Sequence, residues 1–284
     1  MFSQLVLMHL VFFKLLHQFK PTWYSGVPTM HQAILQRAKN NKKIIENSSL
    51  RFIRSSSAAL PKPVLIEMEK TFNCPVIEAY GMTEASHQIA SNPLPPNVRK
   101  NGTVGIGSGL LVEIMDDGGN ILKRNKIGEI VIKGKTVIKQ YANNEKATLS
   151  SFKNGWFKTG DLGFIDEDGY IKVTGRIKEI INKGGEKISP KELDDILQEM
   201  SEIEQVVCFP FSSDRYGEEI GCAIVLKESK KISEKDITEY ASKHLAKFKI
   251  PSKFIFLDEI PKGPTGKLQR IGLSKVLGLE NECK

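Results

Sequence analysis

The stretch 155–190, which reads GWFKTGDLGFIDEDGYIKVTGRIKEIINKGGEKISP, restricts the fold of this chain more than any other part of the sequence. It predicts a strand, an acidic turn, a second strand, a glycine-rich hairpin and the start of a helix. Asp161 follows Thr159-Gly160, and Arg176 ends the second strand, so strand pairing would bring an acid and a base to one ligand. A ligand that offers both hydroxyl groups and negative charge fits this pair, and a nucleotide is the obvious candidate.

Length and charge narrow the classes of protein that this chain can belong to. Its 284 residues, of which 40% are hydrophobic, suffice for one large or two ordinary domains with a sizeable core. The net charge of +8 is concentrated near the start, where Glu46 is the one acidic residue within residues 1–50. Because no basic stripe follows a recognition element, we do not expect nucleic-acid binding. The oligomeric state is left open.

Cysteine usage and the apolar run at the start favour an intracellular protein without a membrane span. The run 5–16 is shorter than the ~20 residues that cross a bilayer, so we expect a buried helix there. We expect a cytoplasmic location; a peroxisomal one is the alternative, although the final residues do not form a peroxisomal tripeptide. Reduced thiols without metal-ligand spacing are expected for the four cysteines, which are Cys74, Cys208, Cys222 and Cys283.

The first eighty residues follow the pattern of an α/β layer. Helices are predicted over 31–39 and 63–72, and strands over 51–53 and 76–79. The second of these strands leads directly into Tyr80-Gly81-Met82-Thr83-Glu84. Because α/β sheets bind ligands at the carboxyl ends of their strands, residues 80–87 lie where a ligand is expected.

Two further patterns follow along the chain. From residue 102 onward, short runs separated by Asp/Gly turns predict antiparallel hairpins that form a small barrel or sheet. From about residue 177, a compact α+β domain is predicted, in which Ser189 and Glu192 form a capping box for a helix up to Met200. Its strands are expected over 206–209, 222–226 and 254–257, and a further helix over 233–245. The domain ends in a glycine-containing loop that exposes Lys267.

Four ordered motifs resemble those of the adenylate-forming enzymes, the group that contains acyl-CoA synthetases, firefly luciferase and the adenylation domains of peptide synthetases. The motifs are YGMTE at 80–84, GWFKTGD at 155–161, GRIKE at 175–179 and GKLQR at 266–270. Each is weak alone, but four in order at sensible distances make chance similarity negligible. The resemblance runs from about residue 21 to the end. Within the group, WYSGVPTMHQ, RFIRSSSAAL, EAYGMTEASHQIASNPLP and INKGGEKISP look most like the oxalate-CoA ligase branch.

The resemblance implies a reaction and a domain arrangement. A small carboxylate would attack the α-phosphate of ATP to give acyl-AMP and pyrophosphate, and the thiol of coenzyme A would then displace AMP after the small domain swings. Residues 1–176 would be the C-terminal part of a large AMP-binding domain, with an α/β layer and a small β-barrel, in which residues 1–20 are atypical. Residues 177–284 would be a small α+β lid domain.

The resemblance also assigns roles around the nucleotide. Tyr80 would stack on adenine beside Gly81, Thr83 would hydrogen-bond a phosphate, and Glu84 would hold Mg²⁺. The simpler alternative for Glu84 is an acid favoured by a helix N-terminus.

The ribose and the coenzyme would be bound by residues of the opening stretch. Asp161 would accept from the ribose hydroxyls with Arg176 beside it, and a plain turn former is the alternative for Asp161. Lys178 would lie at the pivot between the domains. Gly184 and Gly185 would let their hairpin approach the pantetheine arm of coenzyme A.

The acyl pocket is expected to be polar. His87, together with Ser55, Ser57 and His31, would suit a small dicarboxylate such as oxalate. A 4-coumarate or medium-chain fatty acid ligase is the alternative, but it would require a pocket lined by apolar side chains. His87 also has the alternative role of a histidine in the core.

One part of the family pattern is missing. The family places a Ser/Thr/Gly-rich loop that ends in lysine before the first motif, and nothing in residues 1–54 resembles it. We therefore expect an N-terminally shortened product or an incomplete gene model, with a ligase that is inactive as written. A non-catalytic remnant or binding protein is the alternative of a different class.

Lys267 provides the first testable prediction. In-line attack of one anion on another needs cations where charge builds up, and lysine is a compact charge on a flexible stem. Lys267→Ala should lower the rate of acyl-AMP formation by about 10²- to 10³-fold, while thioester formation from supplied acyl-AMP is spared. Separate assays of the two half-reactions check this, and unchanged adenylation would show that Lys267 is only a solvated lysine.

Overall fold

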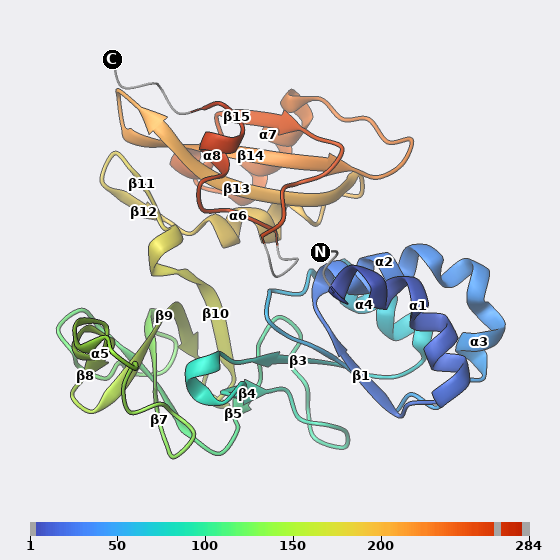
Figure 1. Ribbon diagram of the computed structural model, residues 1–284. Helices are drawn as coiled ribbons and strands as arrows, with labels where there is room; N and C mark the ends of the chain where they lie inside the picture. The colour runs from blue at the N-terminus through green and yellow to red at the C-terminus, as the bar shows by residue number, and fades with distance from the viewer. Residues whose placement is uncertain (1–3, 264–267, 280–284) are drawn as a thin grey trace. The chain divides into compact units, whose positions relative to one another are not determined.

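The chain divides after Val173 into two units with separate hydrophobic cores, Met1–Val173 and Thr174–Lys284. Figure 1 shows the computed structural model, which describes residues 4–263 and 268–279. The proposed catalytic Lys267 lies outside the described residues. We describe each unit by itself.

Three parallel strands form the centre of the first unit. They are β1 (Trp23–Gly26), β2 (Phe52–Ser55) and β3 (Val76–Tyr80), and the antiparallel strands β4 (Ala90–Ser91) and β5 (Ile106–Gly107) extend their sheet. Because the three strands are parallel, the segments that follow Gly26, Ser55 and Tyr80 leave the sheet at the same edge. The predicted α/β layer is thereby confirmed.

Helices drawn in blue and cyan in Figure 1 pack beside this sheet. They are α1 (Gln4–Phe19), α2 (Pro28–Ala38), α3 (Lys42–Glu46) and α4 (Lys62–Phe72). The predicted helix forms, and of its residues from 11 onward Phe13 and Leu16 are 5% and 2% exposed while Val11 and Phe19 are exposed, so its burial is confirmed for one face of this part. Among the described helices, none has the length and apolarity needed to span a bilayer.

An antiparallel sheet completes the first unit. It contains β6 (Leu111–Met115), β7 (Gly128–Lys133), β8 (Phe152–Lys153), β9 (Trp156–Ile165) and β10 (Ile171–Arg176), in the order β10-β9-β7-β6 with β8 paired to β9. The helix α5 (Glu145–Ser151) precedes β8. The hairpins expected from the Asp/Gly turns are confirmed, and Ile130, Ile132 and Phe157 fill the core of this sheet.

The second unit is a mixed sheet with helices. Its strands run in the order β12-β11-β14-β13, and β15 pairs in parallel with β14. The hydrophobic run of β13 is continuous because Val206 and Cys208 face one core while Val207 and Phe209 face another. The elements are β11 (Ile181–Lys183), β12 (Glu186–Ile188), α6 (Pro190–Leu197), β13 (Ile203–Ser213), β14 (Gly217–Leu226), α7 (Glu234–His244), β15 (Lys253–Phe256) and α8 (Leu273–Val276).

The capping box predicted at Ser189 is wrong. The Ser189 hydroxyl donates to the Thr174 carbonyl at 2.6 Å, and the Glu192 carboxylate accepts from Lys249 Nζ at 2.8 Å, so neither side chain caps α6. A capping box is found at α7 instead, where Ser233 Oγ accepts from the Asp236 N–H at 3.2 Å. At Ser189, partners distant in the sequence bind the two side chains that the capping pattern would have used.

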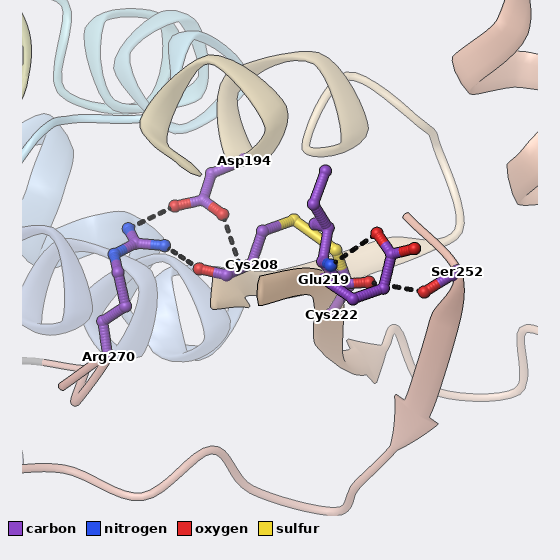
Figure 2. Close-up of a disulfide and its surroundings, with 7 residues drawn as sticks. Asp194, Cys208, Glu219, Cys222, Ser252 and Arg270 are labelled. Atoms are coloured by element: carbon purple, nitrogen blue, oxygen red, sulfur yellow. Dashed lines mark hydrogen bonds and ion pairs between the residues drawn. A yellow bond between two sulfur atoms is a disulfide. The ribbon is translucent and has the colours of Figure 1, made fainter. Parts of the chain in front are cut away.

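The expectation of reduced thiols is also wrong for two of the four cysteines. Cys208 and Cys222 face each other on β13 and β14 and form a disulfide (Figure 2). The sequence separation of 14 residues concealed this pairing, which depends on the strand register. Figure 2 also shows Arg270 between the Asp194 carboxylate and the Cys208 carbonyl, which joins the loop after residue 267 to the middle of this sheet.

His31 is a polar residue in the core of the first unit. It is fully buried on α2, its Nδ1 lies 3.2 Å from the Tyr24 hydroxyl, and its Nε2 lacks a partner among the described residues. Burial lowers the pKa of His31 to about 4, because the charged imidazolium is poorly solvated there.

This shift predicts a loss of stability in acid. Between its ordinary value of 6.5 and about 4, the unfolded chain binds a proton that the folded chain does not, so acidification favours unfolding. At ~1.4 kcal/mol per pKa unit, the full effect is about 3 kcal/mol. His31→Gln should reduce the slope of unfolding free energy against pH between 7 and 4.5, while the exposed His17→Gln should not. Urea unfolding followed by tryptophan fluorescence measures it, because Trp23 and Trp156 both lie in the first unit; equal slopes would contradict the assignment.

Candidate functional site

A close backbone contact fixes the turn that follows β3. A Cβ atom added at Gly81 would lie 1.8 Å from the His87 carbonyl oxygen, so only glycine fits there. The His87 N–H donates to the Met82 carbonyl at 3.0 Å, and the Ile89 N–H donates to the Tyr80 carbonyl at 2.8 Å. Ser86 and His87 have φ of 50° and 78°, which non-glycine residues rarely adopt. The turn thus returns the chain to the end of β3.

Glu84 is held by a tyrosine from the segment between β7 and α5. The Tyr141 hydroxyl donates to Glu84 Oε1 at 2.9 Å, and the Ile138 N–H donates to the Glu84 carbonyl at 2.9 Å. Burial and the Glu84 carboxylate both raise the pKa of Tyr141, so its hydroxyl stays protonated as a donor. Thr83 is exposed beside Glu84.

The surroundings of Glu84 fit a shared Mg²⁺ better than a closed metal centre. Within residues 4–263 and 268–279, no three His, Cys, Asp or Glu side chains gather as metal ligands. Mg²⁺ is commonly held by one or two carboxylates together with substrate phosphates. A half-buried carboxylate with one oxygen fixed by Tyr141 meets that requirement.

Tyr80 and Asp161 are brought together although 81 residues separate them. The Tyr80 hydroxyl donates to Asp161 Oδ2 at 2.6 Å, and Asp161 is 6% exposed.

A register shift between β7 and β9 places Asp161 at this position. The pairing changes register between Glu129 and Val131, opposite Thr159-Gly160-Asp161. The Gly160 N–H donates to Glu129 Oε1 at 3.0 Å, and Thr159 Oγ1 donates to the Ile130 carbonyl at 2.7 Å. Bulges of this kind commonly redirect side chains next to active sites.

A small pocket lies at the carboxyl edge of the parallel strands. Its volume is about 160 Å³, room for roughly five water molecules. Two of its residues, Ser57 and His87, have φ of 74° and 78°, and such backbone strain concentrates at functional sites. The lining residues are Ser25, Gly26, Val27, Met30, Arg54, Ser56, Ser57 and His87.

The structure separates the four residues predicted for the acyl pocket. Ser57 and His87 line the pocket described above. Ser55 is buried at the end of β2, and its Oγ lacks a partner in the described part of the chain. His31 lies against Gly26, whose added Cβ would meet the imidazole Cε1 at 2.9 Å, and it does not line the pocket. Contact of Ser55 and His31 with a substrate stays a prediction.

The remaining predicted residues belong to the second unit. Arg176 and Lys178 are exposed at the end of β10 and in the short 3₁₀ helix Ile177–Glu179. Gly184 and Gly185 form the turn between β11 and β12 with φ of 58° and 93°, as two-residue hairpin turns require. A Cβ at Gly184 would come within 3.2 Å of the Tyr216 ring. Their contacts with ribose or coenzyme A stay predictions.

Sequence reasoning missed two residues of the site. Tyr141 was not singled out, since its link to Glu84 spans 57 residues and follows no motif. Arg54 was passed over inside RFIRSSSAAL, although its position directly before the serine turn was visible. A charged side chain at the end of a buried strand is a signal that could have identified it.

Comparison with known proteins gives matches along nearly the whole chain. The AMP-binding enzyme model matches residues 3–142, and the AMP-binding enzyme C-terminal domain model matches residues 192–267. The oxalate–CoA ligase of Saccharomyces cerevisiae is 48% identical over 250 residues, which are 87% of this chain and 45% of that protein. That of Arabidopsis thaliana is 45% identical over 254 residues, 89% of this chain and 49% of that protein.

A solved structure has a similar fold. The crystal structure of ATP-bound MatB from Rhodopseudomonas palustris matches with a TM-score of 0.86 and 31% identity, over 94% of this chain and 53% of that one. The chain therefore spans about half the length of the relatives that it matches.

Gly81 provides a test of how the turn is built. Gly81→Ala should destabilise the first unit by about 3 kcal/mol, because backbone atoms of His87 cannot move aside as a side chain would. Urea unfolding followed by tryptophan fluorescence measures the change.

Gly118→Ala is the matched control. Its added methyl group would meet only the ends of the Asn120 and Asp116 side chains, at 3.0 and 3.1 Å. Equal stability of the two variants would show that the turn has room for a side chain at Gly81.

Proposed function

The chain belongs to the AMP-binding enzyme family, and we propose that it serves an AMP-forming acid–thiol ligation in which ATP activates a small carboxylate, oxalate, for transfer to coenzyme A. The observation that carries this proposal is the turn at Gly81. On one side it presents Tyr80 and Glu84, and on the other it places His87 in the small pocket. One rigid turn would therefore align a nucleotide with an acid.

The nucleotide would be bound by residues of the first unit. Tyr80 would offer its ring to adenine while its hydroxyl orients Asp161, whose carboxylate would accept from the ribose hydroxyls. Thr83 would donate to a phosphate. Glu84, oriented by Tyr141, would hold Mg²⁺, which when bound neutralises charge on the phosphate oxygens.

Adenylation would join two anions. A carboxylate oxygen of the acid would bond to the α-phosphorus of ATP as the bond to pyrophosphate breaks. Lys267 would supply positive charge at the attacking oxygen and the α-phosphate. In the second half-reaction, the sulfur of coenzyme A would attack the acyl carbon, and AMP would leave. Arg176 would assist at the ribose, Lys178 would lie at the pivot, and Gly184 and Gly185 would face the pantetheine arm.

The pocket and the relatives support oxalate as the acid. A volume of about 160 Å³ is below the ~300 Å³ from which pockets for larger ligands start. Arg54, Ser57 and His87 line it beside apolar side chains and would bind a charged acid, whereas 4-coumarate or a medium-chain fatty acid would require a longer apolar wall. The two curated relatives described above are named oxalate–CoA ligases.

An exchange assay tests this proposal. When the missing Ser/Thr/Gly-rich loop is supplied upstream of the chain, oxalate should support the fastest ATP–pyrophosphate exchange among oxalate, 4-coumarate and octanoate. Asp161→Asn should weaken ATP binding by about 10- to 100-fold, since a hydrogen bond to a charged group contributes ~1.5–3 kcal/mol. Asp117→Asn, in an exposed turn, is the control and should bind ATP as the unmodified chain does.

Each other outcome has a definite meaning. Faster exchange with 4-coumarate or octanoate would contradict oxalate and favour a ligase for those acids. ATP binding that depends on Asp161, without exchange for any acid, would favour the non-catalytic binding protein.

A further inference from the structure

We propose that Arg54 binds the second carboxylate of the acid and thereby selects short dicarboxylates over monocarboxylates. This inference rests on the proposed function and assigns a specificity-determining role within its acyl site. Arg54 lies within RFIRSSSAAL, a segment that resembles the oxalate-CoA ligase branch, but none of the four motifs described above includes it. The inference comes from the position of this side chain, its partners and the size of the pocket.

Strand register directs Arg54 to the pocket. Arg54 lies on β2 between Ile53 and Ser55, both of which are buried, and it is paired in register with Ser25 of β1. Because side chains alternate along a strand, Arg54 projects to the face opposite to Ile53. Its side chain is half-buried and lines the pocket.

The guanidinium is held by two neutral partners from different segments. Nη1 donates to Ser25 Oγ at 3.1 Å, and Nη2 donates to Gln88 Oε1 at 3.4 Å. Gln88 follows His87 in the turn that Gly81 fixes, and its own amide donates to Ser108 Oγ at 3.3 Å. The guanidinium is therefore oriented without its charge being neutralised.

Other partly buried arginines of the chain are bound differently. Arg99 pairs with Glu69 at 2.5 Å, and Arg270 pairs with Glu179 and Asp194 at 2.9 and 2.6 Å. In the described part of the chain, no carboxylate forms an ion pair with Arg54. A partly buried charge without a counter-charge is costly, and an anionic ligand would relieve that cost.

The chemistry of the pocket specifies the anion. A guanidinium binds a carboxylate through two parallel hydrogen bonds, which combine charge with direction. The pocket is small, at about 160 Å³, and a short acid whose second carboxylate lies close to the reacting one fits it. Ser57 and His87 line the same pocket and would contact the rest of the acid. Oxalate has this shape, with its two carboxylates directly joined.

A charge-based site would also reject the wrong acids. A monocarboxylate would leave the Arg54 guanidinium desolvated and without a partner, and sites that leave a polar group unpaired discriminate strongly. The apolar side chains Val27 and Met30 also line the pocket, but they cannot supply a counter-charge for Arg54. Selection would thus depend on the second charge more than on size.

The test uses two ligands that differ in one charge. Oxamate has the shape of oxalate, but an amide replaces one carboxylate. Calorimetric titration of the 284-residue chain should show at least about tenfold tighter binding of oxalate, as expected for a charge-assisted hydrogen-bonded pair. Arg54→Met should reduce this preference to about one. Arg54→Lys should leave an intermediate preference, because lysine keeps the positive charge but cannot donate two parallel hydrogen bonds to one carboxylate.

Arg51→Met is the matched control. Arg51 is exposed three residues before Arg54 and does not line the pocket, so the preference for oxalate should be unchanged. Thermal unfolding of each variant establishes that it is folded. If Arg54→Met does not fold, the Arg54→Lys variant provides the test. If Arg54→Lys prefers oxalate over oxamate as strongly as the unmodified chain does, the inference is overturned.

Failure of the inference can be told apart from failure of the proposed function. An unchanged preference in Arg54→Met, with oxalate still bound and exchanged, overturns the role of Arg54 alone. Absence of binding of both ligands, together with absence of pyrophosphate exchange, overturns both proposals.

Discussion

The contact between Gly81 and the His87 carbonyl is the constraint on which the candidate site depends. Because these backbone atoms lie too close for any side chain at residue 81, the turn after β3 has one compact path. That path sets the positions of Tyr80, Glu84 and His87 at the same time. Two distant partners, Tyr141 from the segment before α5 and Asp161 from β9, then fix the directions of Glu84 and Tyr80.

Most of the fold was predictable from local pattern, since its elements carry their own signals. The strand over 76–79 was predicted to within one residue of its end, and the helix ending at Phe72 was predicted to within one residue of its start. The failures arose where tertiary partners decide. The hydroxyl of Ser189 has a better acceptor in the Thr174 carbonyl than a cap would offer. The pairing of Cys208 with Cys222 follows from a register that no local pattern encodes.

The candidate site was predictable to a smaller extent. Motifs identified Tyr80, Glu84, Asp161 and His87 because each lies next to a turn or strand end that the sequence marks. They could not show that Tyr80 donates to Asp161, since this contact requires the register shift between β7 and β9. Residues whose role depends on a distant partner are therefore visible only in the fold.

Arginine in this chain shows how surroundings decide the role of a residue type. Arg270 meets two carboxylates and a backbone carbonyl, so its hydrogen-bonding capacity is used inside the protein and it serves to hold the second unit together. Arg54 meets two neutral oxygens beside an open pocket, so its charge is oriented but not neutralised. The charge of Arg270 is paired with carboxylates inside the protein and stabilises the fold. The charge of Arg54 is not paired with a carboxylate in the described part of the chain and can attract an anionic ligand. That difference, more than any motif, is what makes the pocket edge a selective site for an anion.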